Sequence, residues 1–387
     1  MKRFILHVGF HKTATSSIQQ TLASNQEELL KQGFYYPLFE NNDSKVINHS
    51  IPFYSAFCEN PEKYHINIRQ GGDIVQINRN YLKQFEEILK IERNVIISGE
   101  DISVLPKYSL VKIREKIIAS GFKLEVYCSV RRPYSLLCSD ISEIVKSGIS
   151  SIEQVTYPNR VKVVHKLKDV FEEEITFFSF EKDCNQGNPV EVFIERLGIK
   201  CSDFTLTKSN EGLGNLSTRA LSNLNKNFPI IKDGAINPNG RCFFYTSIDN
   251  EKFLLTQQEF QRFKKDVDKE NEDYGFLLGA DFQDKSIEYS QELRISIDMA
   301  VKIYQDYAQS HTSHALLKFI AKYASFPLHY LAEHFPENVE VLRDLALVLE
   351  DVNINKSYEL MLCARNLRPR GPLINSKISY YESKLSK

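Results

Sequence analysis

Residues 4–19 constrain this chain most, because they predict a strand, a turn and a helix within one short stretch. Residues 4–8 form an apolar run with the length and the aromatic or β-branched character of a buried strand, and Gly9 ends that run. From residue 18 onward the spacing of apolar side chains suits a helix. The turn between them is rich in hydrogen-bond donors, namely Lys12, Thr13, Thr15, Ser16 and Ser17.

The start of such a helix favours an anion, and a phosphate in particular. Its first backbone N–H groups have no partner within the helix and carry a partial positive charge, so a phosphate placed there accepts several hydrogen bonds at once. Lys12 adds a point charge. A nucleoside triphosphatase loop reads G-x-x-x-x-G-K-[ST], whereas here His11 stands directly before Lys12. The alternative is a helix that Thr or Ser merely caps.

Two carboxylates follow a second predicted strand. The apolar residues 94–98 lead to Glu100 and Asp101. Ligands bind at the carboxyl ends of parallel strands in open α/β sheets, so carboxylates at that position are candidate general bases. Alternatively, Asp101 caps the next segment and Glu100 is solvated. His49 lies between apolar residues and is either a packing residue or a catalytic base.

A third predicted strand, residues 123–130, ends at Arg131, and Pro133 suits the first position of a following helix. A dianionic phosphate is bound well by a planar, multi-donor guanidinium together with a hydroxyl on a rigid helix. Spacing places three serines of that helix on one face: Ser135, Ser139 and Ser142. This segment therefore predicts a second anion site, unless Arg131 and the serines only face solvent.

Taken together, the two motifs resemble those of sulfotransferases that use 3′-phosphoadenosine 5′-phosphosulfate (PAPS). Residues 12–16 match the K-[ST]-[GA]-T-[ST] core of the loop that binds the 5′-phosphosulfate. Ala14 stands where glycine is usual, and we expect a slightly more open turn to accommodate it. Arg131 and Ser139, with Pro133 between them, match the family's 3′-phosphate motif R-x-P-x-x-x-x-x-S. The resemblance covers about residues 1–280.

The resemblance implies an α/β fold with a central parallel sheet flanked by helices, as in nucleotide kinases. It implies transfer of the sulfuryl group of PAPS to a hydroxyl of a carbohydrate or glycolipid acceptor, as in bacterial polysaccharide biosynthesis, with release of adenosine 3′,5′-bisphosphate. The expected catalytic residues are Lys12 and a base, either Glu100 or His49, with His11 as a third choice. The residues expected to hold the nucleotide are His11, Lys12, Thr13, Ala14, Thr15, Ser16, Ser17, Arg131 and Ser139.

The family also carries a basic G-x-x-G-x-x-K loop over the adenine and 3′-phosphate, and this chain has no clean copy of it. Either Gly240 with Arg241, or Lys208 with Arg219, is expected to supply that charge. No metal is required by the expected chemistry, and the sequence has no cluster of metal-ligand residues.

The chain is long enough for two domains, with 387 residues. We predict a sulfotransferase domain over residues 1–280 and an all-helical extension over residues 286–387. Residues 336–369 resemble one tetratricopeptide-like helical pair. A single repeat does not stabilise a solenoid, so we expect a hairpin that is docked on the catalytic domain or used in a homodimer contact.

Composition excludes several classes of protein. The net charge of −1 provides no global basic field for nucleic acid or anionic lipid. The first apolar run is too short for a signal peptide or a membrane span. Seven cysteines without a C-x-x-C pair are typical of a reduced, cytoplasmic protein.

Two other functions compete with the sulfotransferase. A P-loop kinase that uses ATP and Mg²⁺ requires a glycine-lysine loop and an acidic metal ligand; Asp101 can be that ligand, but the loop is missing. A non-catalytic nucleotide-binding module that recruits a partner through its helical tail is the other alternative.

Overall fold

The structure is a computed structural model that describes residues 1–41, 44–208, 212–244 and 246–386. It divides into two compact units, and the chain passes between them repeatedly. The first unit comprises Met1–Leu137, Pro158–Glu211 and Phe263–Ile287, and the second comprises Cys138–Tyr157, Gly212–Arg262 and Glu288–Lys387. The last of these passages lies close to the predicted domain boundary. The predicted first domain, however, is not one unit, because residues 138–157 and 212–262 belong with the C-terminal helices.

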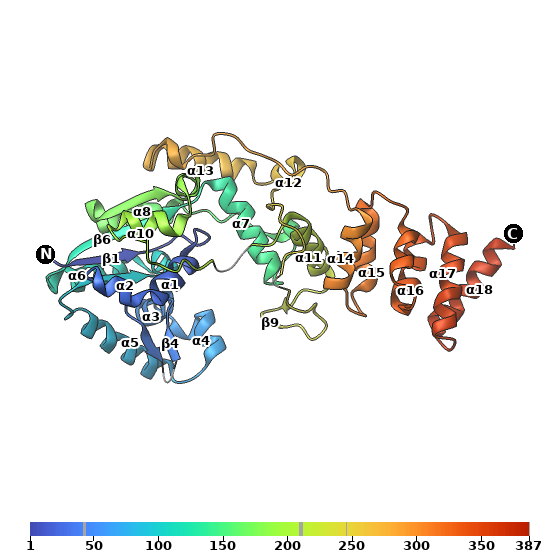
Figure 1. The fold of residues 1–387 in the computed structure, drawn as a ribbon, viewed down its shortest axis with the longest axis horizontal. Helices are drawn as coiled ribbons and strands as arrows, with labels where there is room; N and C mark the ends of the chain where they lie inside the picture. The colour runs from blue at the N-terminus through green and yellow to red at the C-terminus, as the bar shows by residue number, and fades with distance from the viewer. Residues whose placement is uncertain (42–43, 209–211, 245, 387) are drawn as a thin grey trace. The chain divides into compact units, whose positions relative to one another are not determined.

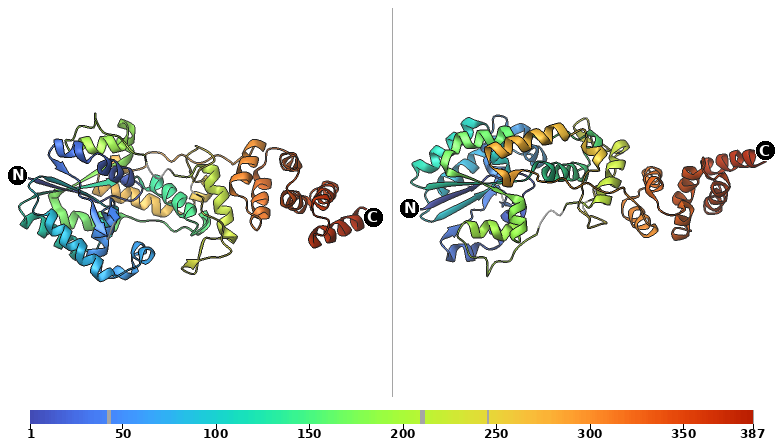
Figure 2. Two further views of the ribbon diagram at one scale, coloured as in Figure 1. Left: turned by 60° about the horizontal axis from the view of Figure 1, so that its bottom comes forward. Right: turned by 90° about the horizontal axis from the view of Figure 1, so that it is seen from above.

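The first unit is built on a five-stranded parallel sheet with the strand order β2-β5-β1-β6-β7 (Figure 1). Central β1 pairs with β5 on one side and with β6 on the other, so that Phe4 lies opposite both Val95 and Leu124. Figure 2 shows the strands running side by side. The strands are β1 (Arg3–His7), β2 (Phe34–Tyr35), β5 (Asn94–Ser98), β6 (Lys123–Val130) and β7 (Ile175–Ser179). This sheet confirms the predicted fold class.

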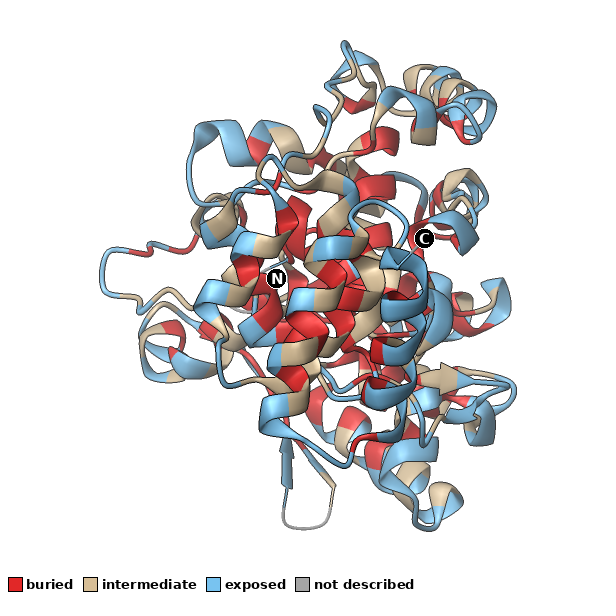
Figure 3. Ribbon diagram, turned by 90° about the vertical axis from the view of Figure 1, so that its right-hand side faces the viewer, coloured by how far each residue is buried: buried red, intermediate tan, exposed pale blue. Residues whose placement is uncertain are grey.

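Helices cover both faces of the sheet. Because successive side chains of a strand point to opposite faces, Phe4 and Leu6 of β1 join one core and Ile5 joins the other. Figure 3 shows that the helices carry buried residues on one side and exposed residues on the other. The first core includes α5 (Ile74–Ile88), α6 (Lys107–Ala119) and α8 (Val161–Phe171), and the second includes α1 (Thr15–Ser24) and α10 (Pro189–Arg196).

The strand order places a topological switch point at β1. After β1 the chain runs to β2 and β5 on one side of it, and then crosses to β6 and β7 on the other side. Ligands of open α/β sheets bind outside the carboxyl ends of the strands at such a point. The segment that follows β1 is therefore where the fold itself favours a binding site.

The predicted first helix is two helices, α1 and α2 (Gln26–Lys31), separated at Asn25. The Asn25 amide donates to the carbonyl oxygens of Thr21, at 2.7 Å, and Thr205, at 3.0 Å, and its side-chain oxygen accepts from the Thr205 N–H group at 2.9 Å. This side chain thus binds a distant segment of the chain at the break between the helices.

Residues 60–80 are a polar stretch that contains α4 (His65–Gln70) and the first turns of α5. The buried Asn67 amide donates to Ser55 Oγ at 2.7 Å and to the Pro61 carbonyl oxygen at 2.8 Å. Asp73 caps α5 by accepting from the Gln76 N–H group at 3.1 Å. The polar residues of this stretch therefore hold it in place rather than mark a loop.

The remaining elements of the first unit connect these layers. They are β3 (Phe39–Asn41), β4 (Ser44–Val46), α3 (Ser50–Phe57), η1 (Pro61–Lys63), η2 (Glu100–Val104), η4 (Glu172–Glu174), α9 (Phe180–Gln186), α13 (Lys264–Leu277) and η5 (Ala280–Phe282). Helix α7 (Pro133–Lys146) begins in the first unit, and its residues from Cys138 onward are counted with the second.

The second unit is mainly helical, and its C-terminal helices pack one upon the next (Figure 1). The predicted helical pair corresponds to α16 and α17, but this pair is one step in a longer run rather than a single hairpin. Buried side chains such as Leu345, Met361 and Ile378 line successive steps. The elements are η3 (Ile152–Gln154), α11 (Asn215–Asn227), β8 (Ile231–Lys232), β9 (Ala235–Ile236), α12 (Gln257–Phe260), α14 (Ile297–Tyr307), α15 (Ser313–Tyr323), η6 (Leu328–His334), α16 (Val339–Leu349), α17 (Ile354–Leu367) and α18 (Pro372–Leu385).

Candidate active site

The turn between β1 and α1 lies over the ends of the neighbouring strands. The Val8 N–H group donates to the Tyr127 carbonyl oxygen at 2.9 Å, and the Phe10 N–H group donates to the Ser129 carbonyl oxygen at 2.6 Å. Gly9 has φ +99°, and a Cβ at this position would lie 3.1 Å from Cα and Cβ of Glu100. Glycine is therefore needed here both for its conformation and for the close approach to Glu100.

Ala14 adopts a backbone conformation that usually favours glycine. It takes up the left-handed conformation itself, with φ 61° and ψ 18°, directly before α1. Lys12 is also left-handed, with φ 66°. A left-handed residue that carries a Cβ costs about 1–2 kcal/mol, which explains why glycine is usual at the position of Ala14. The turn bears this strain at Ala14.

The threonine hydroxyls of the turn point inward. Thr13 Oγ1 and Thr15 Oγ1 both donate to the Phe10 carbonyl oxygen, at 2.6 and 3.2 Å, and both residues are buried. Their hydroxyl protons therefore stabilise the turn, a role that the sequence alone did not indicate. Four residues of the turn are only partly buried: His11, Lys12, Ala14 and Ser16.

Arg131 brings the second motif to the first. Its Nη1 donates to the Lys12 carbonyl oxygen at 2.9 Å, and its Nε donates to Ser135 Oγ at 2.9 Å. The guanidinium also lies 5.2 Å from the centre of the Phe180 ring and 3.9 Å from Glu181 Oε1. The two predicted anion-binding segments, more than a hundred residues apart in the sequence, thus meet at the carboxyl ends of β1 and β6.

The start of α7 is occupied by carboxylates. The Arg132 N–H group donates to Glu181 Oε2 at 3.1 Å, and the Tyr134 N–H group donates to Asp284 Oδ2 at 2.8 Å. Burial raises the pKa of Asp284 to about 6, although the Tyr134 amide opposes this shift. Sequence reasoning missed both acids, because they come from distant segments with no motif of their own. Ser139, predicted to bind the same phosphate as Arg131, lies on the part of α7 that belongs to the second unit.

Glu100 and Asp101 follow β5 as predicted, and they point to different neighbours. Glu100 Oε2 accepts from Gln19 Nε2 at 3.0 Å and from Ser50 Oγ at 3.2 Å. Asp101 Oδ1 lies 3.1 Å from His11 Nε2, and Asp101 Oδ2 accepts from the Tyr64 hydroxyl at 2.6 Å. Burial alone would raise the pKa of Asp101, but hydrogen bonds from His11 and Tyr64 outweigh it, so the pKa lies below its usual value.

His49 is a packing residue. It is fully buried and stacks on Tyr36, with ring centres 4.4 Å apart. Its Nε2 donates to the Pro37 carbonyl oxygen at 2.6 Å, and its Nδ1 accepts from the Ser98 N–H group at 3.0 Å. Burial lowers the pKa of His49 to about 3, although the bond to Pro37 opposes this shift. Both ring nitrogens are committed to the main chain, which argues against the predicted role of His49 as a base.

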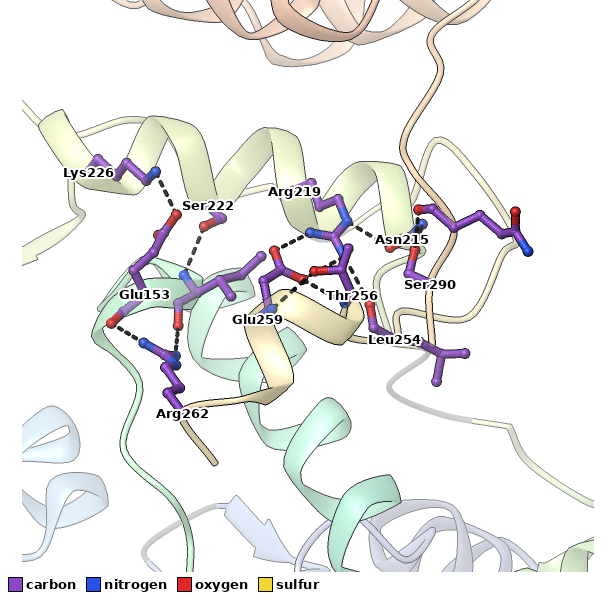
Figure 4. A network of polar contacts seen from close by, with 12 residues as sticks. Glu153, Asn215, Arg219, Ser222, Lys226, Leu254, Thr256, Glu259, Arg262 and Ser290 are labelled. Atoms are coloured by element: carbon purple, nitrogen blue, oxygen red, sulfur yellow. Dashed lines mark hydrogen bonds and ion pairs between the residues drawn. The ribbon is translucent and has the colours of Figure 1, made fainter. Parts of the chain in front are cut away.

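The arginines expected to cover the nucleotide are used inside the second unit. Arg219 forms an ion pair with Glu259 at 2.6 Å and donates to the Leu254 carbonyl oxygen at 3.0 Å (Figure 4). Arg241 is buried and donates to Asn225 Oδ1 at 2.6 Å and to the Val145 carbonyl oxygen at 2.8 Å. Neither arrangement supports the predicted role. Lys208 in that role stays a prediction.

A hollow of about 790 Å³ lies within the second unit, and none of the predicted site residues lines it. Its charged lining residues are Asp249, Glu251, Glu292 and Arg294. In the described part of the chain, no group of three His, Cys, Asp or Glu side chains is arranged to hold a metal ion. Within the same residues, none of the helices combines the length and the apolar character that crossing a membrane requires.

Three comparisons with known proteins add no relative: no family model, curated protein or solved structure matches this chain.

Proposed function

We propose that this chain is a PAPS-dependent sulfotransferase that acts on a hydroxyl of a carbohydrate or glycolipid. The observation that carries the proposal is the hydrogen bond from Arg131 Nη1 to the Lys12 carbonyl oxygen, at 2.9 Å. It joins two segments that each resemble one half of a PAPS site, and it does so at the switch point of the sheet. Had the two segments lain on unrelated surfaces, the proposal would have failed.

The donors of the turn fit the 5′-phosphosulfate end of PAPS. Ala14 has no side-chain oxygen that could cap α1, so the amides of the first turn retain their preference for an anion. Lys12 and Ser16 lie on the partly exposed side of the turn. Arg131 fits the 3′-phosphate, although Glu181 already lies 3.9 Å from its Nε atom.

PAPS supplies an activated sulfuryl group attached to a phosphate that leaves. In the proposed reaction Lys12 and the start of α1 bind that phosphate and stabilise the negative charge that grows on it, while Arg131 orients the far end of the nucleotide. The acceptor hydroxyl must give up a proton to a base at this edge of the sheet. Of the two predicted bases, Glu100 lies beside the turn, at Gly9, and His49 is buried.

The test is to incubate the purified full chain with PAPS and a panel of bacterial glycans and glycolipids, and to measure adenosine 3′,5′-bisphosphate by chromatography. We expect release that depends on an acceptor. Binding of adenosine 3′,5′-bisphosphate without release for any acceptor would instead support a non-catalytic binding module. Phosphate transfer from ATP that requires Mg²⁺ would support a kinase, an outcome that Asp101 does not favour, since His11 and Tyr64 occupy both of its oxygens.

Substitution of the loop lysine should have the largest effect. Lys12→Ala should lower turnover by about 100-fold or more, because a donor aimed at the developing charge is lost. The control is Lys90→Ala, which removes an exposed lysine paired with Glu87 at 2.8 Å, and which should leave turnover unchanged. Equal rates in the two variants would contradict the assignment of Lys12.

A further inference from the structure

A histidine, a carboxylate and a phenol form a chain of hydrogen bonds beside Lys12. His11 Nε2 lies 3.1 Å from Asp101 Oδ1, and the Tyr64 hydroxyl donates to Asp101 Oδ2 at 2.6 Å. The Asp101 N–H group donates to Ser50 Oγ at 3.1 Å, which fixes the backbone of the carboxylate. Solvent exposure falls from one side chain of this hydrogen-bonded series to the next. The His11 side chain is 34% exposed and that of Asp101 14%, and Tyr64 is buried.

The contact between His11 Nε2 and Asp101 determines which nitrogen of His11 is basic. A carboxylate accepts hydrogen bonds, so the neutral imidazole carries its proton on Nε2, toward Asp101. The lone pair is then on Nδ1, for which the described residues provide no hydrogen bond. An imidazole oriented by a buried carboxylate is the usual arrangement of a general base, because the carboxylate holds the ring and stabilises the imidazolium that forms.

The other candidate bases are less well placed. Glu100 Oε2 already accepts from Gln19 Nε2 at 3.0 Å and from Ser50 Oγ at 3.2 Å, so it ties helix α1 to α3. His49 has both nitrogens bonded to the main chain. His11 is partly exposed, as is Glu100. His11 is also adjacent in sequence to Lys12, which keeps a base and a phosphate-binding cation at a fixed spacing.

We propose that His11 is the general base for the acceptor hydroxyl and that Asp101 and Tyr64 are its positioning residues, an inference that rests on the proposed function. As the acceptor oxygen forms its bond to sulfur, its proton passes to His11 Nδ1. The bond between sulfur and the bridging phosphate oxygen breaks, and its electron pair stays on the phosphate beside Lys12. No metal or redox partner enters this balance.

Two substitutions of His11 separate a base from an anion-binding cation. His11→Gln and His11→Lys should both lower kcat by about 100-fold or more, because general-base catalysis is lost in each. Both should keep the calorimetric affinity for adenosine 3′,5′-bisphosphate within about threefold, since His11 is not its main ligand. If His11→Lys retains the rate, the residue acts as a cation and the proposal is overturned.

The positioning residues have a separate readout. Asp101→Asn should lower kcat by about tenfold or more and weaken the preference of the His11 proton for Nε2 in nitrogen-15 spectra, because an amide can donate to that nitrogen where a carboxylate only accepts. Other groups near His11 are Lys12, Tyr64, Glu100 and His65. Tyr64→Phe should lower kcat about two- to fivefold, as one hydrogen bond to Asp101 is removed. His65→Gln is the matched control, since it removes a nearby exposed imidazole, and it should leave both kcat and the proton position of His11 unchanged.

Two measurements keep this inference distinct from the proposed function. Nitrogen-15 spectra of labelled histidine should show His11 with its proton on Nε2 at neutral pH in the unmodified protein, whatever its activity. A proton on Nδ1 would overturn the assignment of the base and leave the sulfotransferase proposal standing. A rate loss in Glu100→Gln, together with a normal rate in His11→Gln, would do the same. Absence of any acceptor-dependent product with the unmodified chain would overturn both proposals.

Discussion

Helices α1 and α11 begin in opposite ways. Both have hydroxyl-rich first turns, Thr15 to Ser17 in α1 and Ser217 with Thr218 in α11. The residue before α1, Ala14, has no side-chain oxygen, and Lys12 lies just upstream. In α11, Asp249 accepts from the N–H groups of Leu216 at 3.0 Å and Ser217 at 2.9 Å.

The difference shows that a helix start with many hydroxyls is not by itself an anion site. The α11 start already has an anion of its own, the Asp249 carboxylate. Gly214 permits this approach, because a Cβ there would overlap that carboxylate. The start of α7 is a third case, closed by Glu181 and Asp284. We expect the first amides of α1 to bind a ligand, and substitutions of the carboxylates at the other two helix starts to change stability only.

The largest of these effects should come from Asp284. Its pKa of about 6, raised by burial, lies above the value of about 4 that an unfolded aspartate has. A raised pKa stabilises the fold below pH 4, and this contribution is lost as the pH rises through 6, by at most about 3 kcal/mol. Asp284→Asn should therefore gain unfolding free energy relative to the unmodified chain between pH 4 and pH 7.

Chemical denaturation at several pH values measures this gain. The control is Asp281→Asn, because the pKa of exposed Asp281 is lowered by its hydrogen bond with Lys182 and shifts in the opposite direction. If the gain in unfolding free energy does not grow with pH, ionisation of Asp284 costs the folded protein no stability, and the prediction is wrong.

Substitution of Arg131 tests the predicted binding of the nucleotide. Arg131→Ala should weaken the binding of adenosine 3′,5′-bisphosphate by about 10- to 100-fold, as a charge-assisted contact is lost. Isothermal titration calorimetry measures the affinity. Arg132→Ala is the matched control, since the neighbouring guanidinium contacts the Asp281 carbonyl oxygen at 3.4 Å, and it should bind normally. Unchanged affinity in both variants would remove Arg131 as a ligand of the 3′-phosphate.

Substitution of Asp249 tests α11, whose first amides already donate to the Asp249 carboxylate. Asp249→Ala removes acceptors from the first amides of α11 and should cost about 1–2 kcal/mol of stability. Hydrogen exchange at the start of α11 should rise, while the affinity for adenosine 3′,5′-bisphosphate stays the same. Glu251→Gln, which changes an exposed neighbouring acid, should have no effect on exchange. A loss of nucleotide affinity in Asp249→Ala would contradict the distinction between the two helices.

The smallest effect is expected at Ala14. Ala14→Gly relieves the left-handed strain at φ 61° and adds chain entropy to the unfolded state, for a net gain of about 0.5–1 kcal/mol. The unfolding midpoint measures it, and Ala23→Gly within α1 should instead destabilise the protein. A loss of stability in Ala14→Gly would mean that the turn bears no strain at this residue.

Local patterns predicted the frame of the candidate site. The strands that end at His7, Ser98 and Val130, and the helix that begins at Pro133, lie where apolar runs and a proline indicated them. Such signals are contained in a few consecutive residues. The meeting of the segments that hold Lys12 and Arg131 was implied by their resemblance to two halves of one PAPS site, although the sequence alone does not determine which atoms touch.

The partners of the site residues could not be predicted in the same way. His49 was a candidate base from the family resemblance, and no pattern in the sequence indicated its contacts with the ring of Tyr36 and the carbonyl of Pro37. Glu181 is also part of an unremarkable helical sequence. The roles of these residues depend on contacts between segments far apart in the chain, and so does the neutralisation of Arg219 by Glu259.

The repeated passage of the chain between its two units has a consequence for how the protein can be shortened. Residues 288–387 are packed with residues 212–262, and Asn223 of α11 donates to the Ala315 carbonyl oxygen of α15 at 3.1 Å. A stop codon placed after residue 287 would therefore strip α11 of its covering and leave apolar surface in water. The tail is not a detachable appendage, and a gene truncated there should yield an aggregating product instead of a smaller folded protein.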